Sequence, residues 1–372
     1  MATVSTVSKP GYIYDANTDT WYPIGVGSHT HSDAIPASAN VFAGKNKIIN
    51  GDFGVWQRGV GPFTGNGAFG PDRFINSFTG TGAALSNSQQ TFTPGAAPVA
   101  GYESTFFSRY AVTAGSDAVN SYVFVTHKIE DVRQCAAQTV TVSFYAKATS
   151  GTPGISFDIY QDFGTGGSAI PTSTGQKVAI STSWARYSLT FSLASISGKT
   201  IGTGSNFAVR MWFSAGSAFN STTGTLGTQS NTFDIWGVQV EQGSTATPFQ
   251  TASGTIGGEL ALCQRYYVRN GGVSVYQELG FLSATSGTGA NGQIPVPATM
   301  RVAPTSIDFS TLSLTEYSGN VAVTNLTLTG SAGGGNVIPV TATVASGLTQ
   351  YRMYAIRTNN STSGYIGFSA EL

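Results

Sequence analysis

The chain has 372 residues, only 10% of them charged, and its 18 basic side chains balance 18 acidic ones. A neutral, weakly charged surface argues against nucleic acid or an anionic membrane as the main partner. A chain of this length exceeds one ordinary hydrophobic core, so we expect two or three domains. Abundant Gly, Ser, Thr and aromatic residues with few Lys and Glu predict an all-β protein with many short strands.

Residues 1–44 form a distinct N-terminal segment. Two short aromatic strands are predicted on either side of a turn at Asp15–Asp19, and small polar residues follow Gly27. This is too little to bury a core, so we expect the segment to be extended and to gain order against another chain. No secretory leader and no stretch of 18 apolar residues is present, which predicts synthesis in a cytoplasm and no membrane insertion.

Residues 45–250 alternate apolar and polar side chains in runs separated by turn residues. The run "TVTVSFYAKA" places four apolar side chains on one face: Val140, Val142, Phe144 and Ala146. The runs "GISFDIYQDF" and "ARYSLTFSL" repeat this period of two. Such spacing predicts a two-sheet β-sandwich.

Residues 251–372 carry a second, smaller set of strands, for which we expect a smaller C-terminal β-sandwich. The small residues "TASGTIGG" at 251–258 predict a flexible hinge before it. One helical pattern interrupts the strands at Ile256–Val268, where four side chains would share a face: Leu260, Ala261, Gln264 and Tyr267. The final strand "GYIGFSAEL" is expected to be an edge strand that pairs with another subunit, and no heptad pattern offers a coiled coil instead.

Two cysteines and one histidine have structural interpretations. Cys135 and Cys263 match no metal or redox spacing, so we expect two free, buried thiols, with a bridge between them as the alternative. His127 lies on a strand-like run and is expected to be a structural histidine with a hydrogen-bond partner. The neighbours Tyr266 and Tyr267 point to opposite faces if extended, so one should pack and the other reach a neighbouring subunit.

Five tryptophans could stack on sugar rings, because indole offers a large apolar face with a polar edge: Trp21, Trp56, Trp184, Trp212 and Trp236. Strand alternation favours packing over sugar binding for Trp212 and Trp236, and packing is also favoured for Trp56. The sequence therefore assigns no glycan-binding residue.

Several motifs carry a family resemblance. The segments "NKIINGDFGVWQRG", "GPDRF", "TVSFYAKA", "STSWARYSLTFSL" and "FDIWGVQVEQGSTATPF" resemble the jelly-roll carbohydrate-binding-like domain of bacteriophage tail fibre and receptor-binding proteins, with "NKIINGDFGVWQRG" as its first strand. "ELALCQRYYVR" resembles the start of their small C-terminal β domain. The resemblance covers roughly residues 45–280. It implies a virion surface protein, usually a homotrimer, that binds a glycan of the host surface.

The resemblance divides the chain into a virion-attachment segment (1–44), a jelly-roll domain (45–250) and a C-terminal β domain at the distal tip (251–372). It predicts a tail fibre or adhesin whose partners are phage tail or capsid proteins and a host polysaccharide or lipopolysaccharide. A structural capsid decoration or head spike is the first alternative, and a polysaccharide depolymerase is the second. We expect no enzyme, since no nucleophile elbow is present and a triad would have to draw on three histidines.

Two metal sites can be considered. His29 and His31 point the same way in an extended chain, and three chains around an axis would bring six imidazoles to one divalent transition metal; solvent-exposed linker residues are the alternative. Similar carbohydrate-binding modules hold calcium with an acid directly after "NGDF" and paired Asp near the last strand. In this chain Gly54, and not an acid, directly follows "NGDF", and Asp234 has no second Asp beside it in the last strand. Calcium binding is therefore in doubt. We expect no other cofactor.

Overall fold

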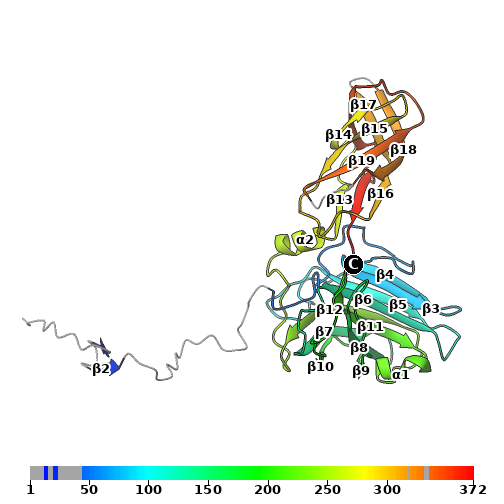
Figure 1. Ribbon diagram of the computed structural model, residues 1–372. Helices are drawn as coiled ribbons and strands as arrows, with labels where there is room; N and C mark the ends of the chain where they lie inside the picture. Colours follow the sequence, from blue (N-terminus) through cyan, green and yellow to red (C-terminus); the bar gives the residue numbers. More distant parts are fainter. Residues whose placement is uncertain (1–11, 16–19, 24–43, 317–318, 331–334) are drawn as a thin grey trace, which may run out of the picture. The chain divides into compact units, whose positions relative to one another are not determined.

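The computed structural model describes residues 12–15, 20–23, 44–316, 319–330 and 335–372. The chain divides into two units, residues 1–40 and 41–372. The described part of the first unit is an antiparallel pair of strands, β1 (Tyr12–Asp15) and β2 (Thr20–Pro23), with Asp15 opposite Thr20 (Figure 1). The predicted pair of short strands is therefore confirmed.

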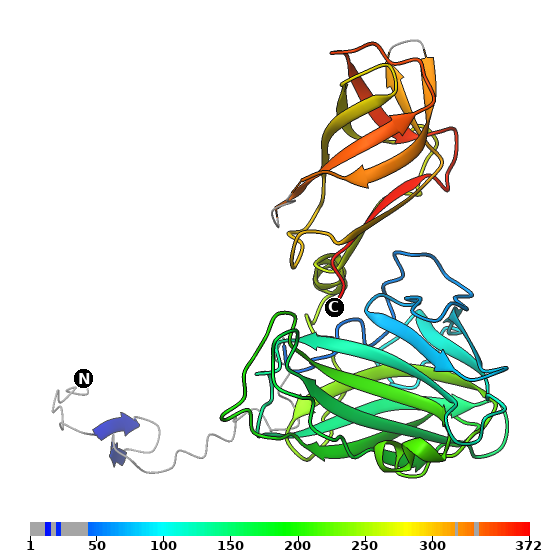
Figure 2. The ribbon, with the colours of Figure 1, turned by 45° about the vertical axis from the view of Figure 1, so that its right-hand side comes forward.

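The second unit begins with a β-sandwich of two five-stranded antiparallel sheets (Figure 2). The first sheet has the order β10 (Ala185–Ser192), β7 (Thr139–Ala148), β12 (Asn231–Gln242), β5 (Phe106–Thr113) and β4 (Ala84–Thr91). The second has the order β3 (Phe74–Thr79), β6 (Tyr122–Glu130), β11 (Asn206–Ala215), β8 (Gly154–Asp162) and β9 (Gln176–Ala179). A short 3-10 helix, η2 (Ser217–Phe219), and α1 (Asn220–Thr223) follow β11. The all-β prediction is confirmed.

The sandwich core lies between the two sheets and follows the alternation of the sequence. On β7 the four apolar side chains of the predicted face are all fully buried. Ile155 and Phe157 of β8 and Phe191 of β10 join the same core. The period of two therefore determined which face of each strand points inward.

The segment 46–59 is a series of tight turns, and the prediction of a first strand here is wrong. Asn50 and Phe53 have positive φ angles of 62° and 56°, which a strand does not allow. The Asn50 side chain holds the turn, accepting from Val55 N at 2.8 Å and donating to Val55 O at 2.9 Å. Gly51 packs so closely on the backbone of Val238 that a Cβ would collide with its carbonyl oxygen.

The predicted flexible hinge is a capped helix start. Thr251 and Ala252 are buried, and α2 (Ile256–Gln264) begins after Thr255, whose side chain accepts from Gly258 N. The predicted helix face is also wrong: Glu259 and Cys263 are the buried side chains of α2, while Leu260 and Ala261 are exposed. Small residues at this place allow close packing and capping, which composition cannot distinguish from flexibility.

The C-terminal strands form a closed barrel rather than a second sandwich. Its order is β14 (Glu278–Ala284), β15 (Gly289–Pro295), β19 (Val337–Val344), β18 (Gly319–Leu328), β17 (Leu312–Glu316) and β20 (Met353–Thr358). The barrel closes because β20 pairs with both β14 and β17. Its interior is filled by a core of its own that includes Leu282, Ile294, Leu314, Val340 and Ile356.

A three-stranded sheet joins the barrel to the sandwich, in the order β13 (Tyr267–Gly271), β21 (Tyr365–Ser369) and β16 (Ser306–Ser310). The last strand, β21, is thus central and paired on both sides, so the prediction of an exposed edge strand is wrong. The sequence of one strand does not show which strands pair with it, so the central position of β21 could not be predicted from "GYIGFSAEL".

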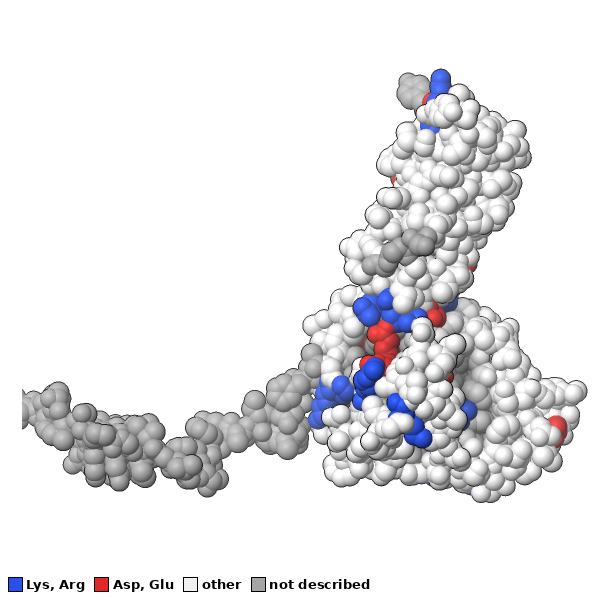
Figure 3. All heavy atoms as spheres, in the orientation of Figure 1, with Lys and Arg blue, Asp and Glu red and all other residues white. Residues whose placement is uncertain are grey.

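Side chains of the sandwich and of the C-terminal region meet where the three-stranded sheet adjoins the sandwich. This contact region, called the joint, comprises Arg58, Asp72, Arg73, Tyr266, Tyr267 and Glu371. Figure 3 shows charged residues gathered on one face between the sandwich and the barrel. Tyr266 and Tyr267 are both buried there, Tyr266 under Arg73 and Tyr267 under Arg58, so the prediction that one reaches another subunit is wrong. Among the described residues, no helix is long and apolar enough to cross a membrane.

Candidate functional site

The outer face of the first sheet carries a cluster of aromatic side chains. Trp236, fully buried, lies at its centre with Phe92 and Phe107. Six partly buried aromatic or aliphatic residues pack around them: Ala97, Val99, Tyr102, Tyr145, Trp184 and Phe249. Packing of Trp236 is thus confirmed, although it lies under loops on the outer face and not between the sheets. The outer face of the second sheet repeats this arrangement with Trp212, Phe124 and Phe219.

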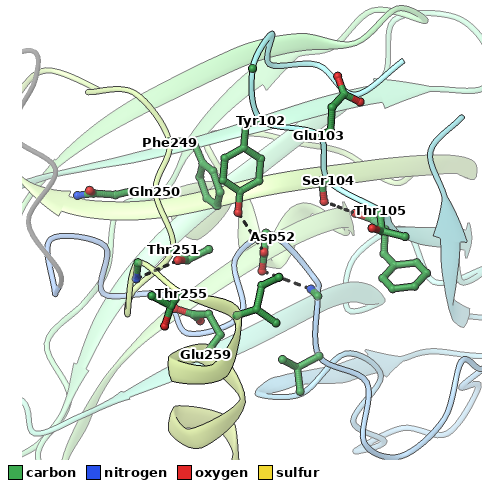
Figure 4. A pocket seen from close by; sticks show the side chains of 16 residues that line it. Asp52, Tyr102, Glu103, Ser104, Thr105, Phe249, Gln250, Thr251, Thr255 and Glu259 are labelled. Atoms are coloured by element: carbon green, nitrogen blue, oxygen red, sulfur yellow. Dashed lines mark hydrogen bonds between the residues drawn. The ribbon is translucent and has the colours of Figure 1, made fainter. Parts of the chain in front are cut away.

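One edge of the first cluster borders a cavity of about 820 Å³. Four segments that are distant in sequence line it: the turn after Asn50, residues 101–106 before and into β5, residues 249–251, and the start of α2 at 254–259 (Figure 4). The cavity lies where the turns of the sandwich meet the first helical turn of α2. Its walls are therefore held by the sandwich and by α2, and it is open to solvent.

Aromatic rings form one wall of the cavity. The rings of Tyr102 and Phe249 meet edge to face with centroids 5.7 Å apart. The Trp236 ring lies behind both, with its centroid 5.5 Å from that of Tyr102 and 4.8 Å from that of Phe249. Such edge-to-face and tilted contacts hold each ring in place. The wall is consequently a preformed apolar surface, to which the partly buried Phe106 adds.

Asp52 places a carboxylate against this wall. Its Oδ2 accepts a hydrogen bond from the Tyr102 hydroxyl and its Oδ1 accepts one from Gly54 N, both at 3.3 Å. Burial and the nearby charge of Glu259 raise the pKa of Asp52, while these hydrogen bonds act in the opposite direction. Burial and the charge of Asp52 also raise the pKa of Tyr102, so its hydroxyl stays protonated and donates. Both hydrogen bonds are long, which leaves the carboxylate able to accept more.

Glu259 is buried at the base of the cavity, and its carboxylate binds two backbone N–H groups. Its Oε2 accepts from Asn50 N at 2.8 Å and its Oε1 accepts from Ser253 N at 2.6 Å. It thereby ties the turn at Asn50 to the chain that leads into α2. Because one backbone donor is bound to each oxygen, Glu259 positions the site and is poorly placed to bind a ligand.

The cavity has carboxylates but no positive charge. Its described lining contains Asp52, Glu103 and Glu259 and no Lys, Arg or His. Glu103 is exposed, accepts from Gly95 N at 3.1 Å and points away from Asp52 in Figure 4. Ser104, Thr105, Thr251 and Thr255, with their hydroxyl groups, and Gln250 are the other polar residues of the lining.

The residues considered for metal binding are only partly described by the structure. His29 and His31 lie outside the described residues, so that metal site stays a prediction. Asp234 forms ion pairs with Arg109 at 2.7 Å and Lys147 at 3.6 Å, so its carboxylate is already neutralised. Within the described part of the chain, no group of three or more His, Cys, Asp and Glu side chains could hold a metal ion.

The predictions for the two cysteines, for His127 and for Trp56 are confirmed. Cys135 and Cys263 are buried free thiols. His127 is buried and its Nε2 lies 3.1 Å from Ile49 O; burial, reinforced by Arg73, lowers its pKa well below the ordinary value. Trp56 is half-buried, packs against the sandwich core and donates to Phe53 O at 2.7 Å. The Trp21 side chain lies outside the described structure.

Sequence reasoning missed four residues of the cavity: Asp52, Tyr102, Phe249 and Glu259. In the sequence, "NGDF" suggests part of a strand and the start of a calcium motif, and "ATPFQ" follows the end of a strand; neither pattern predicts a cavity. A polar residue in the apolar run "IGGELALC" was the one available signal, since a Glu there must find donors if it is buried.

No protein-family model matches the chain, and no curated protein sequence matches it. Among solved structures, the enzymatically active domain of tailspike protein 4 from bacteriophage CBA120 is 16% identical, with a TM-score of 0.33 over 53% of this chain and 21% of that chain. This chain thus spans about a fifth of that tailspike structure.

Two further structures are matched over nearly their whole length. A family 11 carbohydrate-binding module from Clostridium thermocellum is 12% identical, with a TM-score of 0.31 over 51% of this chain and 99% of that chain. The Stig cyclase Fisc from Fischerella sp. TAU is 10% identical, with a TM-score of 0.35 over 55% of this chain and 100% of that chain. Likenesses this low carry no argument about function.

Proposed function

We propose that the chain is a non-enzymatic adhesin that binds a glycan in the cavity between the sandwich turns and α2. The observation that carries the proposal is the combination of a preformed aromatic wall, Tyr102 and Phe249, with the acceptor carboxylate of Asp52 in a cavity of about 820 Å³. A cavity of this size accommodates one to a few sugar units.

The chemistry of the lining fits a sugar. The C–H face of a pyranose is apolar and packs on aromatic rings, while its hydroxyl groups need acceptors such as the Asp52 carboxylate. Tyr102 meets both requirements, because its ring forms part of the cavity wall and its hydroxyl donates a hydrogen bond that orients Asp52. The hydroxyl groups of Thr105 and Thr255 can both donate and accept.

The absence of catalysis is part of the proposal. Cleavage of a glycosidic bond commonly uses two carboxyl groups, one as acid and one as nucleophile or base. Asp52 and Glu259 both line the cavity, but Glu259 accepts two short hydrogen bonds from backbone N–H groups. Such a carboxylate is buried and held in one orientation by two short hydrogen bonds, which suits a structural role.

The biological setting rests on the sequence resemblance to phage tail fibres. We place the chain on a virion, attached through residues 1–44 to tail or capsid proteins and assembled as a homotrimer. Three cavities per trimer would raise the avidity for a repetitive host polysaccharide through effective concentration. Electron microscopy of virions with labelled chain tests this placement, and light scattering of the purified chain tests the trimer.

A glycan array with the full chain tests binding. We expect Tyr102→Ala and Phe249→Ala each to weaken the strongest hit by about five- to thirtyfold, since loss of an aromatic contact removes about 1–2 kcal/mol. Tyr351→Ala, an exposed aromatic on the barrel, is the matched control and should bind normally. Hits that survive both cavity variants would contradict the site, and release of reducing sugar from the bound polysaccharide would favour the depolymerase alternative.

A further inference from the structure

We infer that the cavity selects an uncharged sugar and rejects acidic glycans, with Asp52 as the residue that sets this specificity. The inference rests on the proposed function, because it assumes that the cavity binds a sugar, and it names the class of that sugar. It follows from the charges around the cavity and from the unused hydrogen-bonding capacity of Asp52.

The charge of the cavity is negative and is not neutralised within the described structure. None of the ion pairs that the described Lys and Arg side chains form includes Asp52, Glu103 or Glu259. Elsewhere in the molecule the buried acids have basic partners: Asp158 pairs with Arg210, and Asp234 with Arg109. The cavity is thus the exception, and a uronate, sialate or phosphate group entering it would meet uncompensated negative charge.

The raised pKa of Asp52 shows the direction of this effect. Burial raises the pKa of Asp52, and the negative charge of Glu259 raises that pKa further. An acidic ligand would add a third negative charge at the same place, and it would bind only with uptake of a proton or at a cost in affinity. A neutral ligand carries no such cost.

The hydrogen-bonding capacity of Asp52 favours a ligand that donates. An ionised carboxylate only accepts, and each of its oxygens has spare lone pairs beside one hydrogen bond of 3.3 Å. Two neighbouring sugar hydroxyls can donate to the two oxygens, and these charge-assisted hydrogen bonds are stronger than neutral ones. A carboxylate group on the sugar cannot donate to them. Selection therefore has an attractive and a repulsive part, both centred on one side chain.

The experiment compares matched ligands on the full-length chain. An array that contains neutral, carboxylated, phosphorylated and amine-bearing glycans identifies the strongest neutral hit. Titration calorimetry then measures that oligosaccharide and its derivative in which one C6 hydroxymethyl group is oxidised to a carboxylate. We expect the neutral form to bind about tenfold or more tightly at pH 7, from Coulomb repulsion over several ångströms at an intermediate dielectric constant.

Asp52→Asn is the decisive variant because it removes the charge and keeps the shape. It should weaken the neutral ligand and shrink the ratio of neutral to carboxylated affinity by about tenfold. Glu278→Gln is the control, since Glu278 is exposed on β14 of the barrel and does not line the cavity; it should change the ratio less than about threefold. Thermal unfolding of both variants verifies that each is folded.

Each outcome decides between the inference and the proposed function. Carboxylated glycans that bind as well as neutral ones, in a manner abolished by Tyr102→Ala, overturn the inference and leave the proposed function intact. Amine-bearing sugars that bind far more tightly than neutral ones also overturn it, in favour of a cation-selective cavity. If no glycan binds, or if binding is unaffected by Tyr102→Ala and Phe249→Ala, the proposed function fails and the inference with it.

Discussion

The guanidinium carbon of Arg73 lies 3.3 Å from the centre of the Tyr266 ring. Arg73 follows the "GPD" turn of the sandwich, and Tyr266 stands directly before β13 of the C-terminal region. The same guanidinium forms an ion pair with Glu371 and donates to Lys128 O at 2.7 Å. Arg58 repeats the arrangement, with its guanidinium carbon 3.6 Å from the Tyr267 ring centre and an ion pair of 3.3 Å to Glu371. Stacked Arg–Tyr pairs therefore explain why two tyrosines begin the C-terminal region.

Arg73→Ala is expected to destabilise the second unit by about 3–5 kcal/mol, because it leaves the buried Glu371 carboxylate with a weaker partner and removes the stack on Tyr266. Chemical denaturation with the linear extrapolation measures the change. Arg133→Ala is the matched control: Arg133 pairs with Asp131 on the surface, where both side chains are largely exposed. It should change the free energy of unfolding by less than about 1 kcal/mol. Equal effects of the two variants would argue against the importance of the joint.

Asp72 gives the joint a pH dependence. Burial raises the pKa of Asp72 to about 6, against the lowering effects of Arg58 and of the hydrogen bonds from Gln57. The folded chain then binds more protons than the unfolded chain between about pH 4 and pH 6, so this group's contribution to the free energy of unfolding falls as pH rises through that window. For a shift of about two pH units the fall is about 3 kcal/mol.

Asp72→Asn isolates this contribution, since an amide does not titrate. The stability of the natural chain relative to Asp72→Asn should decrease by about 3 kcal/mol between pH 4 and pH 7. His127 has a lowered pKa and acts in the opposite sense below about pH 6.5, but it is present in both proteins and cancels. Stability curves that run parallel over this range would contradict the prediction.

Thr255 caps α2 through the hydrogen bond from Gly258 N at 3.1 Å. Thr255→Ala should therefore cost about 1 kcal/mol, while Thr255→Ser keeps the acceptor and should cost clearly less. Hydrogen exchange of the Gly258 and Glu259 amides measures the effect locally. Indistinguishable exchange in the Ala and Ser variants would mean that the cap contributes little, as expected of a flexible hinge.

The sandwich could be predicted from sequence because alternation records which side of a strand is buried. β7 shows this directly: its inward residues were predicted at Val140, Val142, Phe144 and Ala146, and all four are buried. Closure of the barrel could not be predicted in the same way. An open and a closed sheet have the same alternation, and only the pairing of β20 with both β14 and β17 distinguishes them.

The cavity was beyond prediction for a related reason. Asn50 N and the Glu259 side chain that accepts from it are 209 positions apart, and no local pattern links them. The positive φ of Phe53 is also unusual for an aromatic residue, so "NGDF" read as an extended segment instead of a turn. A cavity lined by residues from four separate segments produces no periodic pattern in the sequence, whereas a strand packed on a core produces an alternation of apolar and polar residues.

Glu259→Gln tests how the cavity is built, with two separate readouts. The amide group introduced by this substitution would present a donor, in place of an acceptor, to one of the two backbone N–H groups, at Asn50 N or Ser253 N. We therefore expect a loss of about 1–3 kcal/mol in the free energy of unfolding. The pKa of Asp52 should fall toward its ordinary value of 3.8, because the charge of Glu259 is one of the two influences that raise it, although burial remains.

Titration of the Asp52 carboxyl carbon by NMR measures this pKa in the natural chain, in Glu259→Gln and in Glu103→Gln as the control. Only the first variant should lower it, because the charge of Glu103 is not among the causes of the shift. An unchanged Asp52 pKa in Glu259→Gln would mean that the two carboxylates do not influence each other. The cavity would then be less negative at its base than the structure indicates, and rejection of acidic sugars would lose part of its physical basis.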